Sequence, residues 1–166
     1  EHSFAHVMHV AETAGYILET MGYDPRTVEL AKIAGYLHDI GNLVNRKDHS
    51  QSGAVMAWSI LNDMGCDPGE VATIVTAIGN HDEGTGVPVN AVAAAMFLAD
   101  KADVRRSRVR NQDFATFDIH DRVNYSVKKS TLKINEEKTL VKLKLSIDTK
   151  YGSVMEYFEI FMQRMI

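Results

Sequence analysis

Histidines, together with a few carboxylates, are the residues of this chain best suited to chemistry. Six of the seven histidines lie before residue 82, and several fall at the ends of expected helices or within apolar stripes. A buried imidazole needs a hydrogen-bond partner or a metal ion. One such histidine is ordinarily a satisfied core or surface residue, whereas six of them together indicate a metal site.

The adjacent pair His38 and Asp39 is the most informative. It lies in the segment LHDIG at residues 37–41, where an expected helix meets Gly41. Neighbouring helical residues point about 100° apart, so both side chains reach one ion only if the helix ends there. Imidazole with carboxylate suits a divalent transition ion. Asp39 could instead cap the helix or form a salt bridge, but an acid near a helix C-terminus calls for a compensating cation.

The order of three motifs resembles the HD superfamily of metal-dependent phosphohydrolases. The motifs are HVMHVA at residues 6–11, LHDIG at residues 37–41 and LADKAD at residues 98–103, and the resemblance covers residues 4–104. A lone His-Asp pair is a weak signal, but the ordered set is specific. The resemblance implies one ion held by His6, His38, Asp39 and Asp100.

Two further histidines stand where family members with two metals have additional ligands. His49 opens one expected helix and His81 closes another. The resemblance implies a second ion held by His49, His81 and a bridging Asp39, although either histidine could be an ordinary helix-end residue. Two ions about 3.5–4 Å apart can activate a water and neutralise a phosphate. We expect two divalent ions, iron or manganese first, with nickel, cobalt, zinc or magnesium as alternatives.

Residues 80–88 look like an altered form of a motif from the cyclic-dinucleotide phosphodiesterase branch. That branch has a histidine pair, a glutamate and a Gly-Tyr-Pro loop. Here Asn80 replaces the first histidine and Val87 stands in the place of tyrosine. Asn42 likewise replaces the lysine that commonly follows Gly41. The departures argue against hydrolysis of cyclic dinucleotides, but not against hydrolysis of phosphate esters generally.

A basic cluster follows the last motif. Guanidinium groups bind phosphate oxygens in bidentate fashion. The expected substrate contacts are therefore Lys101, Arg105, Arg106 and Arg108. We expect Lys101 and the bridging Asp39 to be catalytic residues, and Asp103 to pair with an arginine. The cluster could equally form a solvated helix end that the helix dipole favours.

The expected activity is hydrolysis of a phosphoester or phosphoanhydride in a small, nucleotide-like molecule through a metal-activated water. Two other classes remain open. One is a di-iron oxygenase of the same fold, with which the ligand set is compatible. The other is a non-catalytic nucleotide or metal sensor. The arginines favour hydrolysis, and the complete ligand set argues against a sensor.

Hydrophobic periodicity indicates a mainly α fold, an HD-domain helical bundle of about five core helices with a β-hairpin addition and a C-terminal helix. The expected helices span residues 4–21, 27–40, about 50–65, about 70–80 and 89–104. Alternating residues at 123–127 and 141–147 indicate a hairpin with a turn at 135–138, and residues 151–166 a last helix. The expected domains are a metal-binding core at residues 1–110 and a hairpin and helix at 111–166, packed on or extending it.

Bulk properties exclude several classes of protein. The 166 residues are 45% hydrophobic and carry a net charge of −4, which argues against an extensive nucleic-acid surface. The single cysteine excludes an intramolecular disulfide framework, so a reducing cytoplasm is expected. No apolar run reaches the length of a membrane span. The apolar faces of the hairpin and last helix are candidates for a homodimer surface.

Overall fold

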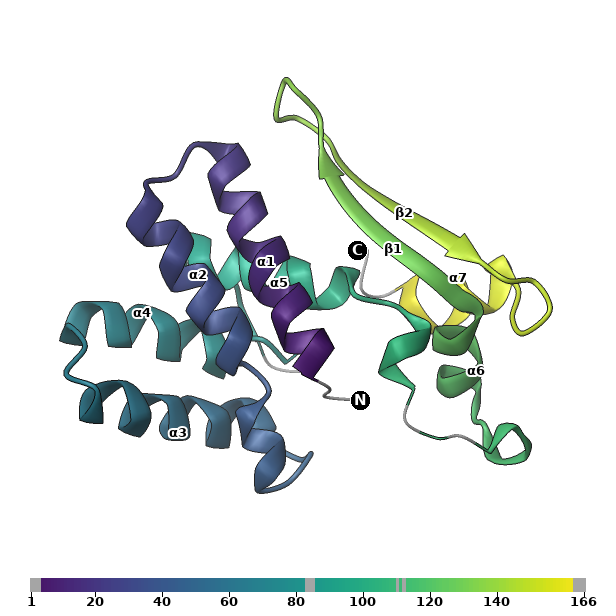
Figure 1. Cartoon of the computed structure of the whole chain (residues 1–166), viewed down its shortest axis with the longest axis horizontal. Coiled ribbons are helices and arrows are strands. Elements are labelled where there is room, and N and C mark those ends of the chain that lie inside the picture. Colours follow the sequence, from purple (N-terminus) through teal and green to yellow (C-terminus); the bar gives the residue numbers. More distant parts are fainter. Residues whose placement is uncertain (1–3, 83–85, 110, 112, 163–166) are drawn as a thin grey trace. The chain divides into compact units, whose positions relative to one another are not determined.

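The computed structural model describes residues 4–82, 86–109, 111 and 113–162 (Figure 1). The first elements along the chain are α1 (Phe4–Met21), α2 (Pro25–Leu37), the short 3-10 helix η1 (Ile40–Leu43), α3 (His49–Asp63), α4 (Pro68–Gly79) and α5 (Ala91–Ala102). They are followed by η2 (Arg106–Arg108), η3 (Phe114–Thr116), α6 (Ile119–Ser126), β1 (Val127–Ile134), β2 (Val141–Ile147) and α7 (Val154–Phe161). The mainly helical fold with one hairpin agrees with the prediction.

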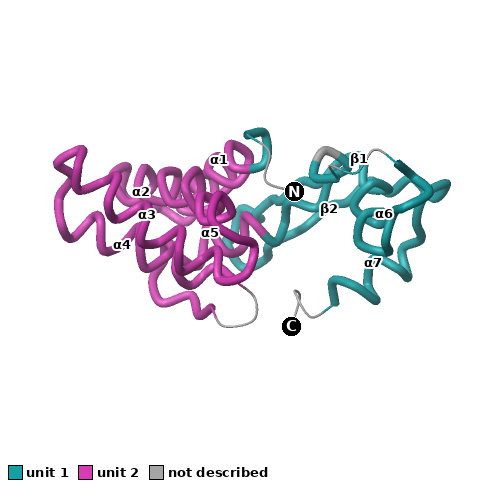
Figure 2. Tube along the Cα trace, turned by 90° about the horizontal axis from the view of Figure 1, so that it is seen from below, with its two compact units in different colours: residues 1, 3–6, 101–166 teal, residues 2, 7–100 magenta. Residues whose placement is uncertain are grey.

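The chain forms two compact units (Figure 2). Unit 2 comprises residues 7–100, and unit 1 comprises residues 4–6 together with the chain from residue 101 onward. The division therefore falls within α1, between His6 and Val7, and within α5, between Asp100 and Lys101. The two units are defined by the contacts within each of them and do not test the expected domains. The domains at residues 1–110 and 111–166 therefore stay a prediction.

Local sequence signals mark the starts and ends of helices in unit 2. Asp24 and Asp67 precede prolines, and each side chain accepts hydrogen bonds from two backbone N–H groups of the first helical turn. Such caps satisfy donors that have no partner within the helix. Gly22 and Gly65 follow α1 and α3 with φ of 87° and 75°, a conformation that glycine adopts without steric cost.

Small residues bring the helices of unit 2 together. A Cβ built on Gly35 of α2 would lie 2.8 Å from Cα of Ala11 and 2.9 Å from its nitrogen, so only glycine allows α1 and α2 to approach this closely. α4 packs on both α2 and α3. The buried apolar side chains include Val10, Ala14, Leu18, Ala31, Ala34, Ala57, Leu61, Ile74, Ile78 and Met96.

Unit 1 is built on the antiparallel hairpin of β1 and β2, in which Leu132 pairs with Leu143 and Ile134 with Val141. Ser153 and Glu156 form a reciprocal capping box at the start of α7. The core of this unit consists of Val104, Val123, Val127, Tyr157 and Phe161, with Leu145, Ile147 and Ile160 partly buried against it.

Several predicted boundaries differ from the structure by two to four residues, and two of these differences affect the core and the site. Residues 123–126 belong to α6, and the first strand begins only at Val127. Val123 and Val127 are both fully buried, and a separation of four residues places two side chains on one face of a helix as well as of a strand. The second helix ends at Leu37 rather than at residue 40, so His38 and Asp39 lie in the turn before η1.

The last helix begins at Val154 rather than at residue 151, and its expected end at residues 163–166 lies outside the described residues, as do residues 83–85 of the altered motif. Lys128, Lys129, Lys142 and Lys144 of the hairpin are all exposed. Among the described residues, no helix combines the length and the apolar character needed to cross a bilayer.

Candidate metal centre

His38 and Asp39 enter the site because α2 ends just before them. The backbone of Asp39 turns away from the helix with φ −96° and ψ 4°. His38 is fully buried, and its Nδ1 donates to the carbonyl oxygen of Gly35 at 2.7 Å. A carbonyl only accepts, so the proton of the neutral ring lies on Nδ1, and Nε2 faces Asp39 Oδ2 at 3.3 Å and Asp100 Oδ1 at 3.7 Å.

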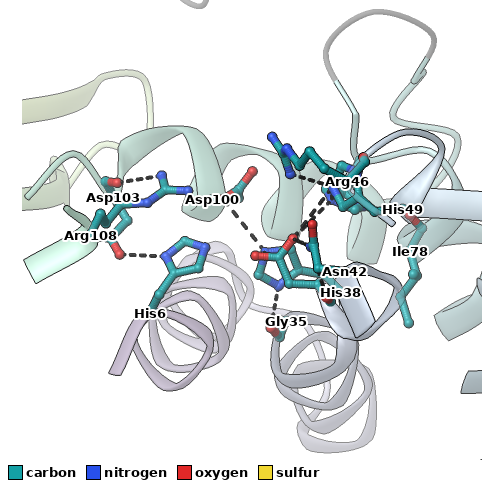
Figure 3. Close-up of polar contacts among 12 residues, drawn as sticks. His6, Gly35, His38, Asn42, Arg46, His49, Ile78, Asp100, Asp103 and Arg108 are labelled. Carbon is teal, nitrogen blue, oxygen red and sulfur yellow. Dashed lines mark hydrogen bonds and ion pairs between the residues drawn. The ribbon is translucent and has the colours of Figure 1, made fainter. Parts of the chain in front are cut away.

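His49 and His81 repeat this arrangement. His49 Nδ1 donates to the carbonyl oxygen of Arg46 at 3.0 Å (Figure 3). His81 Nδ1 donates to the carbonyl oxygen of Ile78 at 2.7 Å. Histidines that bind metals generally donate their second ring N–H in this way, which fixes the ring and directs the lone pair of Nε2 to the metal. The two Nε2 atoms lie 3.0 Å apart. Two lone pairs at that separation call for a cation near both of them.

Asp39 connects the two sets of histidines. Its Oδ2 faces His38, whereas its Oδ1 lies 3.5 Å from His49 Nε2 and 3.9 Å from His81 Nε2. The ligand atoms of Asp39, His49 and His81 all lie within 4.8 Å of one another, and all three residues are buried. These residues fit a divalent ion, because neutral imidazole nitrogens and a carboxylate are ligands that such ions accept.

Gly41 allows the segment that carries Asp39 to pack closely against the helix that carries His49. A Cβ on Gly41 would lie 1.9 Å from the carbonyl oxygen of His49 and 2.5 Å from the nitrogen of Gly53. The backbone after Asp39 therefore packs directly on the first turns of α3. This close approach sets the position of Asp39 relative to His49.

The surroundings keep His49 and His81 neutral. Burial, together with the charge of His38, lowers the pKa of His81 to about 4. Burial also lowers the pKa of His49, and the charge of Arg46 adds to the effect. A metal binds only the neutral ring, so both are ready to bind at neutral pH.

His38 behaves differently from these two histidines. Burial lowers its pKa, but the hydrogen bond and charge of Asp39, together with the charge of Asp100, outweigh that effect and raise it. Here a metal competes with a proton for the ring.

His6 belongs to unit 1 and is oriented by a carboxylate rather than by the backbone. Its Nδ1 lies 2.7 Å from Asp103 Oδ2, and both side chains are buried. Burial raises the pKa of Asp103, but hydrogen bonds from His6 and Arg105 overcome this and lower it to about 2. A histidine oriented by a carboxylate is a common metal ligand. The assignment of His6 as a ligand rests on this orientation and on the motif.

The predicted substrate contacts also lie in unit 1. Arg105 pairs with the carboxylate of Asp103, so the prediction that Asp103 pairs with an arginine is confirmed. Arg108 Nη1 donates to the backbone oxygen of Asp103 at 2.8 Å. Lys101 lies half-buried in the last turn of α5. Substrate binding by these residues stays a prediction, as does the catalytic role of Lys101.

Arg106 has a contact that organises unit 1. Its guanidinium carbon lies 4.2 Å from the centre of the Tyr125 ring, and its Nε donates to the backbone oxygen of Tyr125 at 2.7 Å. The side chain thus tethers the segment after α5 to α6. Its predicted contact with substrate has no support from this position and stays a prediction.

Two residues that contact the proposed metal ligands were not predicted to belong to the site. Asn42 Nδ2 donates to Asp39 Oδ1 at 2.9 Å, which orients the carboxylate. Arg46 contributes its backbone oxygen to His49 Nδ1, and its Nη1 lies 3.1 Å from His49 Nε2. The spacing of three residues between each of these residues and its ligand is the signal that could have revealed them.

Comparison with known families agrees with this geometry. A helical unit in which a His-Asp pair meets two distant histidines defines a candidate metal centre. The HD domain family matches residues 3–105, which is more than half of the chain, and the chain belongs to that family. HD domains are generally metal-dependent hydrolases.

Proposed function

We propose that this protein is a phosphohydrolase with two divalent ions that cleaves a phosphoester or phosphoanhydride of a nucleotide-like substrate. The observation that carries the proposal is the orientation of the Asp39 carboxylate, whose two oxygens face different histidines. One carboxylate oxygen faces His38, on the side of Asp100, and the other faces His49 and His81. A carboxylate that faces two ligand sets in this way is arranged to bridge two ions.

The roles of the protein's residues follow from their positions. Asp39, His38 and Asp100 would hold one ion, with His6 assigned to it by the family motif, and Asp39, His49 and His81 would hold the other. Bound ions of this kind activate a water and neutralise the charge of a phosphate. Asn42 keeps the Asp39 carboxylate in the bridging orientation through its 2.9 Å hydrogen bond.

Arg46 is our additional candidate for binding the substrate phosphate. Residues 1–100 contain 13 acidic residues but only four basic ones, Arg26, Lys32, Arg46 and Lys47. Arg26 pairs with Glu29 and Glu70, whereas Arg46 reaches a proposed ligand nitrogen. A metal on His49 Nε2 would displace the guanidinium from that atom, while the backbone of Arg46 would stay bound to Nδ1. The freed N–H groups would then lie beside the ion, where a phosphate oxygen binds.

Metal analysis of purified variants tests the ligand assignment. We expect two ions per chain in the wild type and about one in His49→Asn and His81→Asn, and a large loss of both in Asp39→Asn. His120→Asn is the matched control, because His120 is an exposed histidine of α6. Full metal content in Asp39→Asn, with a preserved fold, would contradict the proposal.

A substrate screen tests the reaction class. The metal-loaded protein would be assayed against nucleotides, cyclic dinucleotides and dinucleoside polyphosphates with several metals. Formation of hydrolysis products, separated by chromatography, that fails in Asp39→Asn but persists in His120→Asn supports hydrolysis. Oxygen consumption by the iron-loaded protein without turnover of phosphoesters would favour an oxygenase, and tight nucleotide binding without turnover would favour a sensor.

Arg46 is tested through binding of inorganic phosphate. We expect Arg46→Gln to weaken inhibition by phosphate about tenfold or more while metal content stays unchanged, because a charge-assisted hydrogen bond is lost. Lys47→Gln removes the same charge from the next residue and serves as the control. An equal effect of both substitutions would mean that Arg46 acts only through the general field.

A further inference from the structure

The net charge of −4 is the sum of opposite charges on two parts of the chain. Residues 1–100 carry a net charge of −9. Residues 101–166 hold 14 of the 18 Lys and Arg residues and nine of the 22 Asp and Glu residues, and so carry +5. Such asymmetry within one chain points to an anionic partner for the basic part. The net charge of the whole protein conceals it.

Four lysines of the basic part gather on one face of the hairpin in unit 1. Lys129, Thr131 and Lys133 alternate along β1, and the register places Ser146, Lys144 and Lys142 directly opposite them on β2. Alternate residues of a strand share a face, so these six side chains form one patch, here called the lysine face. The same six residues line one hollow on the surface. All four lysines are exposed.

The opposite side of the hairpin is apolar and explains why the lysine face is presented outward. Leu132 pairs with Leu143, and Ser130 pairs with Leu145, which packs against the core of unit 1. The hairpin therefore buries part of one side within its own unit and leaves the four ammonium groups to the solvent.

The lysine face contains no acidic residue to balance it. Lys133 lies directly across from Lys142, and like charges in that position destabilise a hairpin. Among the described residues, none of the four lysines forms an ion pair. Lys128 differs, because it lies at the register shift before the lysine face and pairs with Asp148 at 3.0 Å. A row of unbalanced cations that repel one another would be relieved by a polyanion.

We propose that the lysine face binds the phosphate backbone of double-stranded nucleic acid without regard to sequence. Lys129 and Lys133 are four residues apart, which spans about 13 Å along an extended strand. A duplex carries one phosphate per about 1.7 Å of its axis when both strands are counted, so each of the four ammonium groups along such a length has a phosphate within reach. The hydroxyl groups of Thr131 and Ser146 are further donors to phosphate oxygens.

The composition of the face favours a duplex over other anionic partners. Single strands are commonly held by aromatic side chains that stack on bases, and the lysine face has none. Attachment to an acidic membrane ordinarily requires apolar residues that enter the lipid, and these are also missing from the face. The proposal does not depend on the metal centre, because none of the six residues that carry it is a proposed metal ligand.

Four neutralised phosphates predict a measurable salt dependence. The logarithm of the association constant should fall with the logarithm of the salt concentration with a slope of about −3.6. Affinity should therefore drop roughly 150-fold between about 50 and 200 mM salt. Binding should be weak, as expected for a contact that does not read bases.

The test is fluorescence anisotropy of a labelled random-sequence duplex DNA with the full chain, in the presence of a chelator to prevent hydrolysis. The double variant Lys142→Gln/Lys144→Gln should reduce the magnitude of the slope by about 1.8. The control is Lys138→Gln/Lys150→Gln, which removes the same charge from two residues outside the lysine face and should leave the slope nearly unchanged. All four variant positions are exposed, and circular dichroism would verify that each protein folds.

Several results would overturn the proposal. Equal losses in the two double variants would show that the general positive field, rather than the lysine face, attracts DNA. Tighter binding to phosphatidylserine vesicles, polyglutamate or single strands than to the duplex would assign the face to that other partner. Absence of duplex binding at low salt would leave the lysines the role of preventing the hairpin edge from pairing with other chains.

Discussion

Replacing His81 by asparagine should change how the stability of the metal-free protein depends on pH. Burial and the charge of His38 lower the pKa of His81 from 6.5 to about 4 in the folded state. The unfolded chain therefore binds a proton between these values that the folded chain does not, and stability falls as pH decreases through this window. From about pH 7.5 to about pH 5, linkage gives a loss of about 2 kcal/mol in the free energy of unfolding. His81→Asn removes this contribution, while its amide can still donate to the carbonyl of Ile78.

The assay is urea unfolding in a chelator at about pH 7.5, 6.5 and 5, followed by tryptophan fluorescence. The single tryptophan, Trp58, lies on α3 and reports on unit 2, which contains His81. Wild type and His120→Asn should lose the same free energy on acidification, and His81→Asn should lose about 2 kcal/mol less. If His81→Asn and wild type gave parallel curves, burial of a neutral His81 would be refuted.

Three further substitutions test the packing and capping of unit 2 by urea unfolding. Gly35→Ala should cost about 1–3 kcal/mol, because its Cβ would meet the backbone of Ala11 at 2.8 Å, and an unchanged midpoint would contradict that close approach. Gly15→Ala should instead be neutral or stabilising by up to about 1 kcal/mol, because its Cβ meets only the flexible side chain of Lys32. A large loss of stability would show that the Lys32 side chain cannot move aside. Asp24→Ala should cost about 1 kcal/mol through loss of the cap of α2, and the effect should be absent if water replaces the cap.

Features encoded locally were the ones that the sequence allowed us to predict. An aspartate before a proline marks the start of both α2 and α4, since the side chain caps the helix and the ring fits its first turn. Gly22 and Gly65 mark helix ends for an equally local reason. The prediction of a strand at residues 123–127 was wrong because the spacing of Val123 and Val127 suits a helix as well as a strand. Only tertiary packing decides between the two.

The candidate site required more than local signals. His49 and His81 are 32 residues apart, and no periodicity could place their Nε2 atoms 3.0 Å from each other. Their assignment came from the family resemblance, and the structure adds the orientation of each ring. The contact of Arg46 depends on the conformation of an irregular loop, which residue propensities do not specify. The charge asymmetry, in contrast, can be counted directly from the sequence, but the net charge of the whole chain does not reveal it.

The hydrogen bonds of the three unit 2 histidines have a consequence for how the protein tolerates mutation. His38, His49 and His81 each donate to the carbonyl of the residue three positions earlier, at Gly35, Arg46 and Ile78. Main-chain oxygens persist whatever side chain a position carries, so substitutions that preserve the backbone cannot remove these anchors. His6 relies on a carboxylate 97 residues away, which one base change can abolish. Random substitution should therefore remove the orientation of His6 more often than that of His38, His49 and His81.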